Sequence, residues 1–413
     1  MMGKMIRYEW KKIWQGRLTQ LAMLGCTLFF IFCIISNMSQ TVGSLEDGSQ
    51  VYGMSGIMAI KESRSVTTLT QEETDRLVRE YLDYTANPET NSDNAAYFYL
   101  SEEVYRSYYL PHKELLGMID GIYRTLGSEA SMKEVFEENL GRDILQARLD
   151  RDVRKIDRSM QLGTISDKQG EYWKKQIKKI HEPLSYGYCE GWKQIYFAGN
   201  WAIIIMMIVG IGVAPIFAGE YQSKCDSLFL CMKYGKSKLV ISKVLTAWLF
   251  TTFVYVVLTA GYSIAYLLLY GAEGGDLPIQ LVSPWLSVGY PLTMKQGVLL
   301  VQLLAYVFTL CLMAVTLLLS SLLKNAYGVI VIILPMAFVL ALLSPDQGGY
   351  FWSHILSLFP SQIVNFAFES YTAYGFFGKA FSWLSAGMIV DGICAIAFSC
   401  LSYFVFKQHQ VNR

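Results

Sequence analysis

The sequence predicts an all-α, polytopic membrane protein with six transmembrane helices, an N-terminal interfacial elbow helix and a mainly helical extracellular domain. Hydrophobic residues make up 53% of the 413 residues and charged residues only 17%, against about 25% in a typical soluble domain. The charges are concentrated, because 26 of the 34 acidic and 20 of the 35 basic residues lie between positions 36 and 194. This distribution is typical of a membrane protein that carries one large polar insertion.

Six apolar stretches are long enough to cross a hydrocarbon core of about 30 Å as helices. They cover residues 18–36, 197–217, 244–270, 297–322, 326–343 and 383–406. The first is longer than the apolar core of a secretory signal and precedes no convincing cleavage site, so we interpret it as a span. Pro215 and Pro335 fall inside the second and fifth spans, where each predicts a kink.

Lysine and arginine residues in the short loops predict the orientation. Thirteen of them lie before the first span, in the 219–243 loop, between spans four and five, or after the last span, whereas only Lys295 and Lys379 lie in the alternate loops. We therefore expect both termini and the 219–243 loop in the cytoplasm and residues 37–196 outside the cell. Only Cys189 of the eight cysteines falls in that insertion, so we expect no disulfide within the insertion.

Residues 1–17 predict an elbow helix that lies in the inner membrane interface. Ile6, Trp10 and Ile13 or Trp14 share one helical face, and the cations lie elsewhere. A simple cluster of orientation-setting charges is the alternative interpretation.

The extracellular domain, 37–196, is expected to be mostly helical. Thr70 and Glu73 form a capping-box pattern that begins a helix ending near residue 83. Further helices are expected over residues 101–126, 132–160 and 166–180. In the helix over 132–160, apolar residues recur every three to five positions, at Phe136, Leu140, Ile144, Leu149, Val153, Ile156 and Met160. The last helix carries four lysines, which we interpret as a solvated face rather than a contact with an anionic envelope polymer: Lys174, Lys175, Lys178 and Lys179.

The sequence offers no catalytic, cofactor-binding or metal site. Tyr234-Gly235-Lys236-Ser237 looks like the end of a phosphate-binding loop, but the first glycine of that motif would be residue 230, which is Leu230. The 219–243 loop is also too short to hold a nucleotide-binding domain. The four histidines lack zinc-binding spacing, and no nucleophile elbow is present. We therefore expect neither an enzyme nor a nucleic-acid partner.

The polar loop at 219–243 suits a partner-binding element. Residues 220–232 can form a short helix with Leu228, Phe229 and Met232 on or near one side, and the stretch 233–238 then breaks it. Such a helix could dock a cytoplasmic partner and pass on its movement. The alternative is an ordinary loop whose positive charge only sets the orientation.

With these features the chain resembles the permease, or membrane subunit, of a type-2 ABC transporter. That family has six spans, an elbow helix and a coupling segment that begins with a glutamate and ends with a lysine at the start of the third span. Glu220, residues 226–238 and Lys243 occupy those places, and residues 358–365 resemble the family's outer segment before the last span. The large insertion is similar to that of a subset of permeases from Gram-positive bacteria.

The resemblance implies a mechanism and partners. Two copies of a separate cytoplasmic ABC ATPase would bind ATP and Mg and push on two permeases, this chain pairing with a second copy or a sibling. The pair would export an amphiphilic substrate (a peptide, drug or lipid) across a bacterial cytoplasmic membrane. The residues predicted to couple to the ATPase are Glu220, Asp226, Leu228, Phe229, Met232, Lys233, Tyr234, Gly235 and Lys236.

Asp391 is an unusual charge about 12 Å, or about eight residues, inside the sixth span. A carboxylate at that depth is costly, so we expect it either to line a translocation path or to make a polar contact between helices. Two other functions remain open: a membrane sensor or signalling partner whose extracellular domain binds a peptide, and a scaffold.

Overall fold

The computed structural model describes most of the chain. The described residues are 2–45, 49–64, 66–93, 98–125, 127–180, 184–224, 232, 234–282, 288–342, 349–356, 358, 368, 371–376 and 379–408. Helices dominate, and three short two-stranded antiparallel sheets accompany them.

Five helical runs in this part of the chain are long and apolar enough to cross a membrane. They are α2 (Arg17–Gln40), the run Glu190–Gln222, the run Gly235–Tyr270, α15 (Met294–Leu322) and α19 (Trp383–Gln408). The run Glu190–Gln222 comprises α10 (Glu190–Ala198), η4 (Gly199–Trp201), α11 (Ala202–Val213) and α12 (Pro215–Gln222). The run Gly235–Tyr270 comprises η5 (Gly235–Leu239) and α14 (Val240–Tyr270). The predicted span 326–343 corresponds to α16 (Ala326–Leu342), a shorter apolar helix of 17 residues. A polytopic helical membrane protein is therefore confirmed, and the sixth span stays a prediction.

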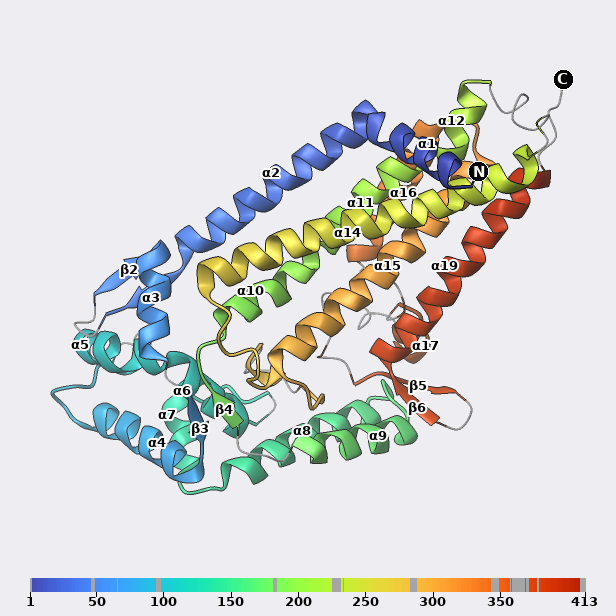
Figure 1. Ribbon diagram of the computed structural model, residues 1–413. Coiled ribbons are helices and arrows are strands. Elements are labelled where there is room, and N and C mark those ends of the chain that lie inside the picture. Colours follow the sequence, from blue (N-terminus) through green and yellow to red (C-terminus); the bar gives the residue numbers. More distant parts are fainter. Residues whose placement is uncertain are drawn as a thin grey trace.

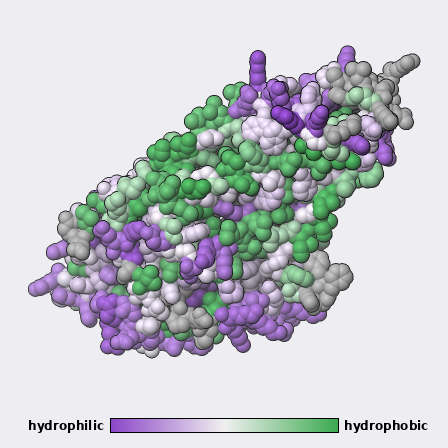
Figure 2. All heavy atoms as spheres, in the orientation of Figure 1, coloured by the Kyte–Doolittle hydropathy of each residue, from purple (hydrophilic) through white to green (hydrophobic). Residues whose placement is uncertain are grey.

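The long helices form a bundle that has hydrophilic residues at both ends. α11 lies inside it and contacts α2, α14, α15 and α16, while α15 and α19 pack along each other (Figure 1). α1 (Met2–Gln15) lies against α14 at the end of the bundle where α19 finishes. Figure 2 shows hydrophobic surface over the middle of the bundle and hydrophilic surface at its two ends.

Pro215 interrupts the second span as predicted, and Ser320 of another helix hydrogen-bonds to backbone groups at the interruption. α11 ends at Val213 and α12 begins at Pro215. Ser320 of α15 donates a hydrogen bond to the carbonyl oxygen of Ala214 at 2.6 Å. The same hydroxyl accepts hydrogen bonds from the backbone N–H groups of Phe217 and Ala218, each at 3.0 Å. Three backbone groups at this break are therefore satisfied by a side chain inside the bundle, where water is not available to replace it.

The insertion folds at one end of the bundle. It contains β1 (Val42–Ser44), β2 (Gln50–Tyr52), α3 (Gly53–Ser63), β3 (Thr67–Leu69), α4 (Gln71–Ala86), α5 (Glu102–Val104), η2 (Tyr105–Tyr109), α6 (Leu110–Tyr123), α7 (Met132–Asn139), α8 (Ile144–Gln161), α9 (Asp167–Ile177), η3 (Lys178–Ile180) and β4 (Leu184–Tyr186). β3 pairs with β4 from Thr67 opposite Tyr186 to Leu69 opposite Leu184. This pairing joins the beginning and the end of the insertion.

The prediction of one helix over 132–160 was wrong, because the chain breaks between α7 and α8. Gly141 adopts a φ of +80°, a conformation that ends helices and favours glycine. Asp143 then caps α8 by accepting a hydrogen bond from the Gln146 N–H at 2.8 Å. Leu140, expected on the apolar face, is 42% exposed at this break.

The other predicted helices of the insertion form with small differences. Thr70 accepts a hydrogen bond from the Glu73 N–H and caps α4. The helix expected over 101–126 is α5, the π-helical turn η2 and α6 in succession. Lys174, expected on a solvated face, pairs with Asp157 at 2.6 Å.

The helices α8 and α9 lie across the end of the bundle from which α19 starts (Figure 1). Trp173 of α9 is 1% exposed and contacts the rings of Tyr290 and Tyr371 edge-on. Gln169 donates a hydrogen bond to the carbonyl of Ala373, which lies in β5 (Ala373–Phe376). β5 and β6 (Lys379–Ser382) form a hairpin directly before α19, and α17 (Gly349–Leu356) lies nearby, so the described parts of 350–382 form short elements.

Candidate functional site

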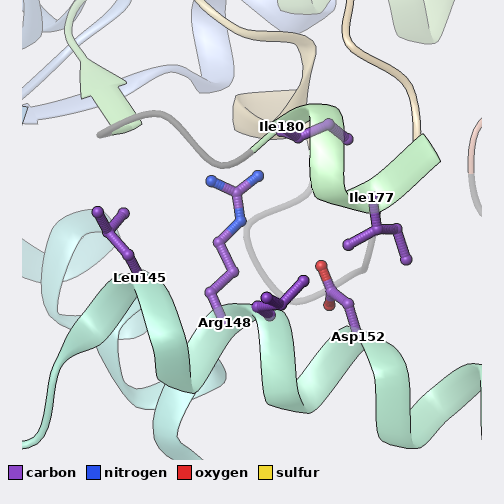
Figure 3. Close-up of a pocket in the computed structure, with 6 residues that line it drawn as sticks. Leu145, Arg148, Asp152, Ile177 and Ile180 are labelled. Carbon is purple, nitrogen blue, oxygen red and sulfur yellow. The ribbon is translucent and has the colours of Figure 1, made fainter. Parts of the chain in front are cut away.

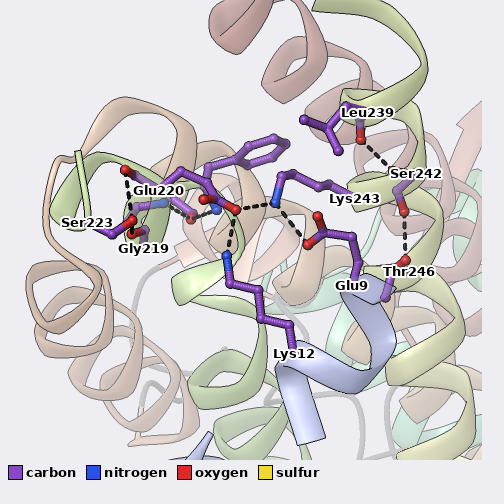
Figure 4. A network of polar contacts seen from close by, with 12 residues as sticks. Glu9, Lys12, Gly219, Glu220, Ser223, Leu239, Ser242, Lys243 and Thr246 are labelled. Atoms are coloured by element: carbon purple, nitrogen blue, oxygen red, sulfur yellow. Dashed lines mark hydrogen bonds and ion pairs between the residues drawn. The ribbon is translucent and has the colours of Figure 1, made fainter. Parts of the chain in front are cut away.

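Four charged side chains from three helices meet at the end of the bundle opposite the insertion. We call Glu9, Lys12, Glu220 and Lys243 the ion-pair cluster. The Lys243 ammonium lies 2.6 Å from Oε1 of Glu220 and 2.9 Å from Oε2 of Glu9. Lys12 lies 2.6 Å from the same Oε1 of Glu220 (Figure 4). The cluster joins α1, α12 and α14.

Because most side chains of the ion-pair cluster are buried, each buried charge depends on the opposite charges beside it. The side chain of Lys243 is fully enclosed, and those of Glu9 and Glu220 are 4% and 2% exposed. A buried ammonium is unfavourable unless acceptors surround it, and two carboxylates supply them here. Lys12, at 43% exposed, supplies the second positive charge from the surface.

Local hydrogen bonds fix the backbone on both sides of the pair. Ser223 donates to the carbonyl oxygen of Gly219 at 2.8 Å, at the end of α12. Ser242 donates to the carbonyl oxygen of Leu239, and Thr246 to that of Ser242, each at 2.7 Å. Glu220 and Lys243 therefore stand on ordered turns at the two ends of the predicted coupling segment (Figure 4).

Aromatic packing holds α1 in place. The rings of Trp10 and Trp14 each contact Phe250 and Phe253 of α14 edge-on, at centroid distances of 5.5–6.3 Å. Ile13 between them is 5% exposed. The face predicted for the elbow helix therefore packs on α14, and its place in a membrane interface stays a prediction.

The predicted coupling residues fall into two groups. Asp226, Leu228, Phe229 and Lys233 lie outside the described residues. Met232 is 50% exposed, Lys236 is exposed, Tyr234 is half-buried and Gly235 is buried. The ammonium of Lys238 lies 4.6 Å from the centre of the Tyr234 ring.

Glu220 differs from an exposed contact residue, because its carboxylate is enclosed and paired with two lysines of this chain. Sequence reasoning did not identify Glu9 and Lys12 as its companions. A signal was present, since Glu9 is the single acid among the five cations that precede the first span.

Asp391 lies between α15 and α19 and is 4% exposed. Oδ2 of Asp391 has no hydrogen-bond partner in the described part of the chain. The polar contact between helices that the sequence predicts for Asp391 therefore stays a prediction. Whether Asp391 lines a path stays a prediction.

A second charged cluster joins the insertion to the bundle. Arg64 lies 2.6 Å from Glu190 and 3.1 Å from Glu114, and Lys193 lies 3.2 Å from Glu114. Burial by itself would raise the pKa of Glu114, but the charges of Lys193 and Arg64 bring that pKa below its usual value. The carboxylate of Glu114 is therefore held ionised.

The insertion contains a cleft of about 630 Å³ beside α6 and α7. Aromatic residues form much of its wall, namely Tyr81, Phe98, Tyr99 and Tyr109. Phe98 and Tyr99 have φ values of +54° and +63°, which non-glycine residues adopt at an energetic cost. This volume lies within the range of small-ligand pockets.

Among the described residues, no group of three or more His, Cys, Asp or Glu side chains is arranged to hold a metal ion.

Comparison with curated proteins found no match, and neither did comparison with solved structures. The family model of the ABC-2 family transporter proteins matches residues 18–404, which is nearly the whole chain. The matched region contains all five long apolar helices except for single terminal turns. The chain therefore belongs to the ABC-2 transporter family and is an integral membrane component of an ABC transporter.

Proposed function

We propose that this chain is the permease subunit of an ATP-driven exporter that moves an amphiphilic substrate across the cell membrane. The observation that carries the proposal is the buried pair between Glu220 and Lys243, which joins the two ends of the predicted coupling segment. Glu9 and Lys12 extend this pair to α1. A force applied to the segment would thus reach three helices together.

The cluster assigns different roles to the predicted coupling residues. Glu220 is a positioning residue, because its carboxylate holds Lys243 and Lys12 and is enclosed. The exposed Met232 and Lys236 are the described residues best placed to touch a partner. Asp226, Leu228, Phe229 and Lys233 are proposed to complete that surface.

The partner is proposed to be a cytoplasmic ABC ATPase that binds ATP and Mg itself. This proposal places both chain ends and the 219–243 loop in the cytoplasm, in agreement with the thirteen lysines and arginines on that side. Two permeases, identical or sibling, would enclose the path, and a bacterial cytoplasmic membrane is the expected location. α16 would be the sixth span and α1 the elbow helix.

The outer cleft supports an amphiphilic substrate. Its aromatic wall suits apolar groups, and charges of both signs stand at its lining: Lys113, Arg124, Asp120, Glu129 and Glu134. A molecule with both polar and apolar parts would match such a lining. The insertion would capture or release it outside the cell.

Co-purification tests the proposal. The chain is co-expressed with an ATPase encoded beside it, purified through a tag on this chain, and assayed for ATP turnover in lipid nanodiscs. We expect the ATPase to co-purify, and Met232→Asp combined with Lys236→Glu to abolish co-purification while the chain remains monodisperse. Lys295→Glu is the matched control, because Lys295 is exposed and pairs only with Asp276 near the insertion.

Retention of the ATPase by the Met232/Lys236 variant contradicts the proposed contact surface. A chain that purifies alone, and binds a peptide without ATP-dependent flux, would instead support the sensor interpretation.

A further inference from the structure

Arg148 of α8 is a buried cation without a bonded partner among the residues described. Arg148 is only 9% exposed. Its guanidinium makes no hydrogen bond or ion pair with any described residue. A guanidinium carries five N–H donors and always keeps its charge. The Arg148 nitrogens are not among the fully enclosed, unpartnered side-chain atoms of the described residues, so a ligand can reach them from the pocket.

The neighbouring carboxylate of Asp152 does not form an ion pair with Arg148. Asp152 lines the same pocket, but Arg151 holds it, with Nη2 and Nε of Arg151 at 3.0 and 3.1 Å from Oδ1 of Asp152. Burial lowers the pKa of Arg148, and the attraction of Asp152 offsets this only in part. The two arginines and one aspartate therefore leave one net positive charge.

The pocket around Arg148 combines this charge with apolar walls. Figure 3 shows Arg148 rising from α8 toward the segment that carries Ile177 and Ile180. Leu145 and Leu149 complete the apolar lining. The pocket is partly open and has a volume of about 10 Å³, which accommodates about one water-sized group. The pocket thus admits an oxygen atom or two of a larger molecule, and the rest of that molecule must lie outside.

The pocket lies on the part of the insertion that covers the bundle. Ile177 belongs to α9, whose Trp173 packs on Tyr290, which precedes α15, and on Tyr371, which precedes β5. A molecule with an anionic head and a hydrocarbon tail could reach the guanidinium with its head and the neighbouring apolar residues with its tail.

We propose that Arg148 binds an oxyanion, a phosphate oxygen, and that the apolar residues beside it contact the hydrocarbon of an amphiphile. A planar guanidinium presents paired donors that match a phosphate group, which is why arginine rather than lysine serves here. The site is separate from the ion-pair cluster. It can therefore exist whether or not an ATPase binds at the other end of the bundle, and the two proposals fail independently.

Hydrogen exchange on the full chain in phosphatidylcholine nanodiscs tests the site. Inorganic phosphate is titrated at constant ionic strength, balanced with chloride, and exchange is followed by mass spectrometry in α8 and α9. We expect phosphate to slow exchange there and Arg148→Met to weaken the apparent affinity by at least about tenfold. Arg154→Met is the matched control, because Arg154 lies on the same helix and is exposed.

Further arms distinguish the source of the phosphate. If a lipid headgroup is the ligand, nanodiscs of phosphatidylglycerol protect α8 and α9 without added phosphate, and Arg148→Met removes this protection. If free phosphate is the ligand, only the titration has an effect. Arg148→Lys keeps the charge without the paired donors, and we expect this variant to bind phosphate more weakly than the unmodified chain. It provides a second test if Arg148→Met fails to fold.

Three results would overturn the proposal: equal protection by chloride, no response to either phosphate source, or an unchanged response in Arg148→Met.

Discussion

Lys243 and Glu220 form an ion pair of 2.6 Å although 23 residues separate them, and both side chains are almost fully enclosed. The pair closes a loop between two long helices, and Glu9 binds the same ammonium from α1. The two helices that flank the loop and the helix before the first span are therefore held by one set of charges.

Removing one partner of this pair should destabilise the bundle. Lys243→Met leaves Glu9 and Glu220 facing each other in a buried site, so we expect a loss of about 3–5 kcal/mol in the free energy of unfolding. Glu220→Gln should cost less, because Lys243 keeps Glu9. Denaturant unfolding in detergent measures both, and a double-mutant cycle gives the coupling energy.

Lys12→Met serves as the control for that cycle. Lys12 is 43% exposed, so its pair with Glu220 is expected to contribute about 1 kcal/mol or less. A larger loss for Lys12→Met than for Lys243→Met would contradict the assignment of Lys243 as the centre of the cluster.

Ser320→Ala should destabilise the protein at the Pro215 break. The hydroxyl of Ser320 serves the carbonyl of Ala214 and the N–H groups of Phe217 and Ala218. Leaving buried backbone groups unsatisfied costs about 1–3 kcal/mol. Ser402→Ala is the control, because Ser402 is equally enclosed but bonds only to Ser399 of its own helix. Equal unfolding midpoints for the two variants would argue against this role of Ser320.

Acid should loosen the join between the insertion and the bundle. The pKa of Glu114 lies below its usual value of 4.5, so the folded state favours the carboxylate. Its stabilising contribution is therefore complete above that value and is lost as the pH falls through the lower pKa of the folded state. Thermal unfolding at pH 7 and pH 4 should show a fall in midpoint that is smaller in Glu114→Gln. An identical fall in both chains would count against this pair as the cause.

Asp391→Leu should stabilise the packing of α15 and α19. One oxygen of the Asp391 carboxylate lies buried without a partner, and removing such a group recovers about 1–3 kcal/mol. A stabilised variant whose partner ATPase loses its substrate response would show that Asp391 is kept for function at the expense of stability. Asp391→Asn, which keeps the shape, should change stability by less than about 1 kcal/mol. A marked loss of stability in Asp391→Leu would instead identify a structural contact.

Much of the membrane part could be predicted from the sequence, because a span needs only a long run of apolar residues. The runs that begin near Arg17, Met294 and Trp383 appear as helices at nearly the expected positions. The helix break at Gly141 was missed, because the apolar pattern continued through it while backbone conformation and the Asp143 cap decided the outcome.

The sequence by itself determined the helical membrane architecture, the polar insertion and the residues that bracket the predicted coupling segment. Only the tertiary structure decided what those residues do, because contacts between distant positions leave no local pattern. Glu9 and Lys243 lie 234 residues apart and still share one buried hydrogen bond. Arg148 falls on a helix with other arginines, and the packing of α9 against α8 distinguishes it by burying most of its side chain.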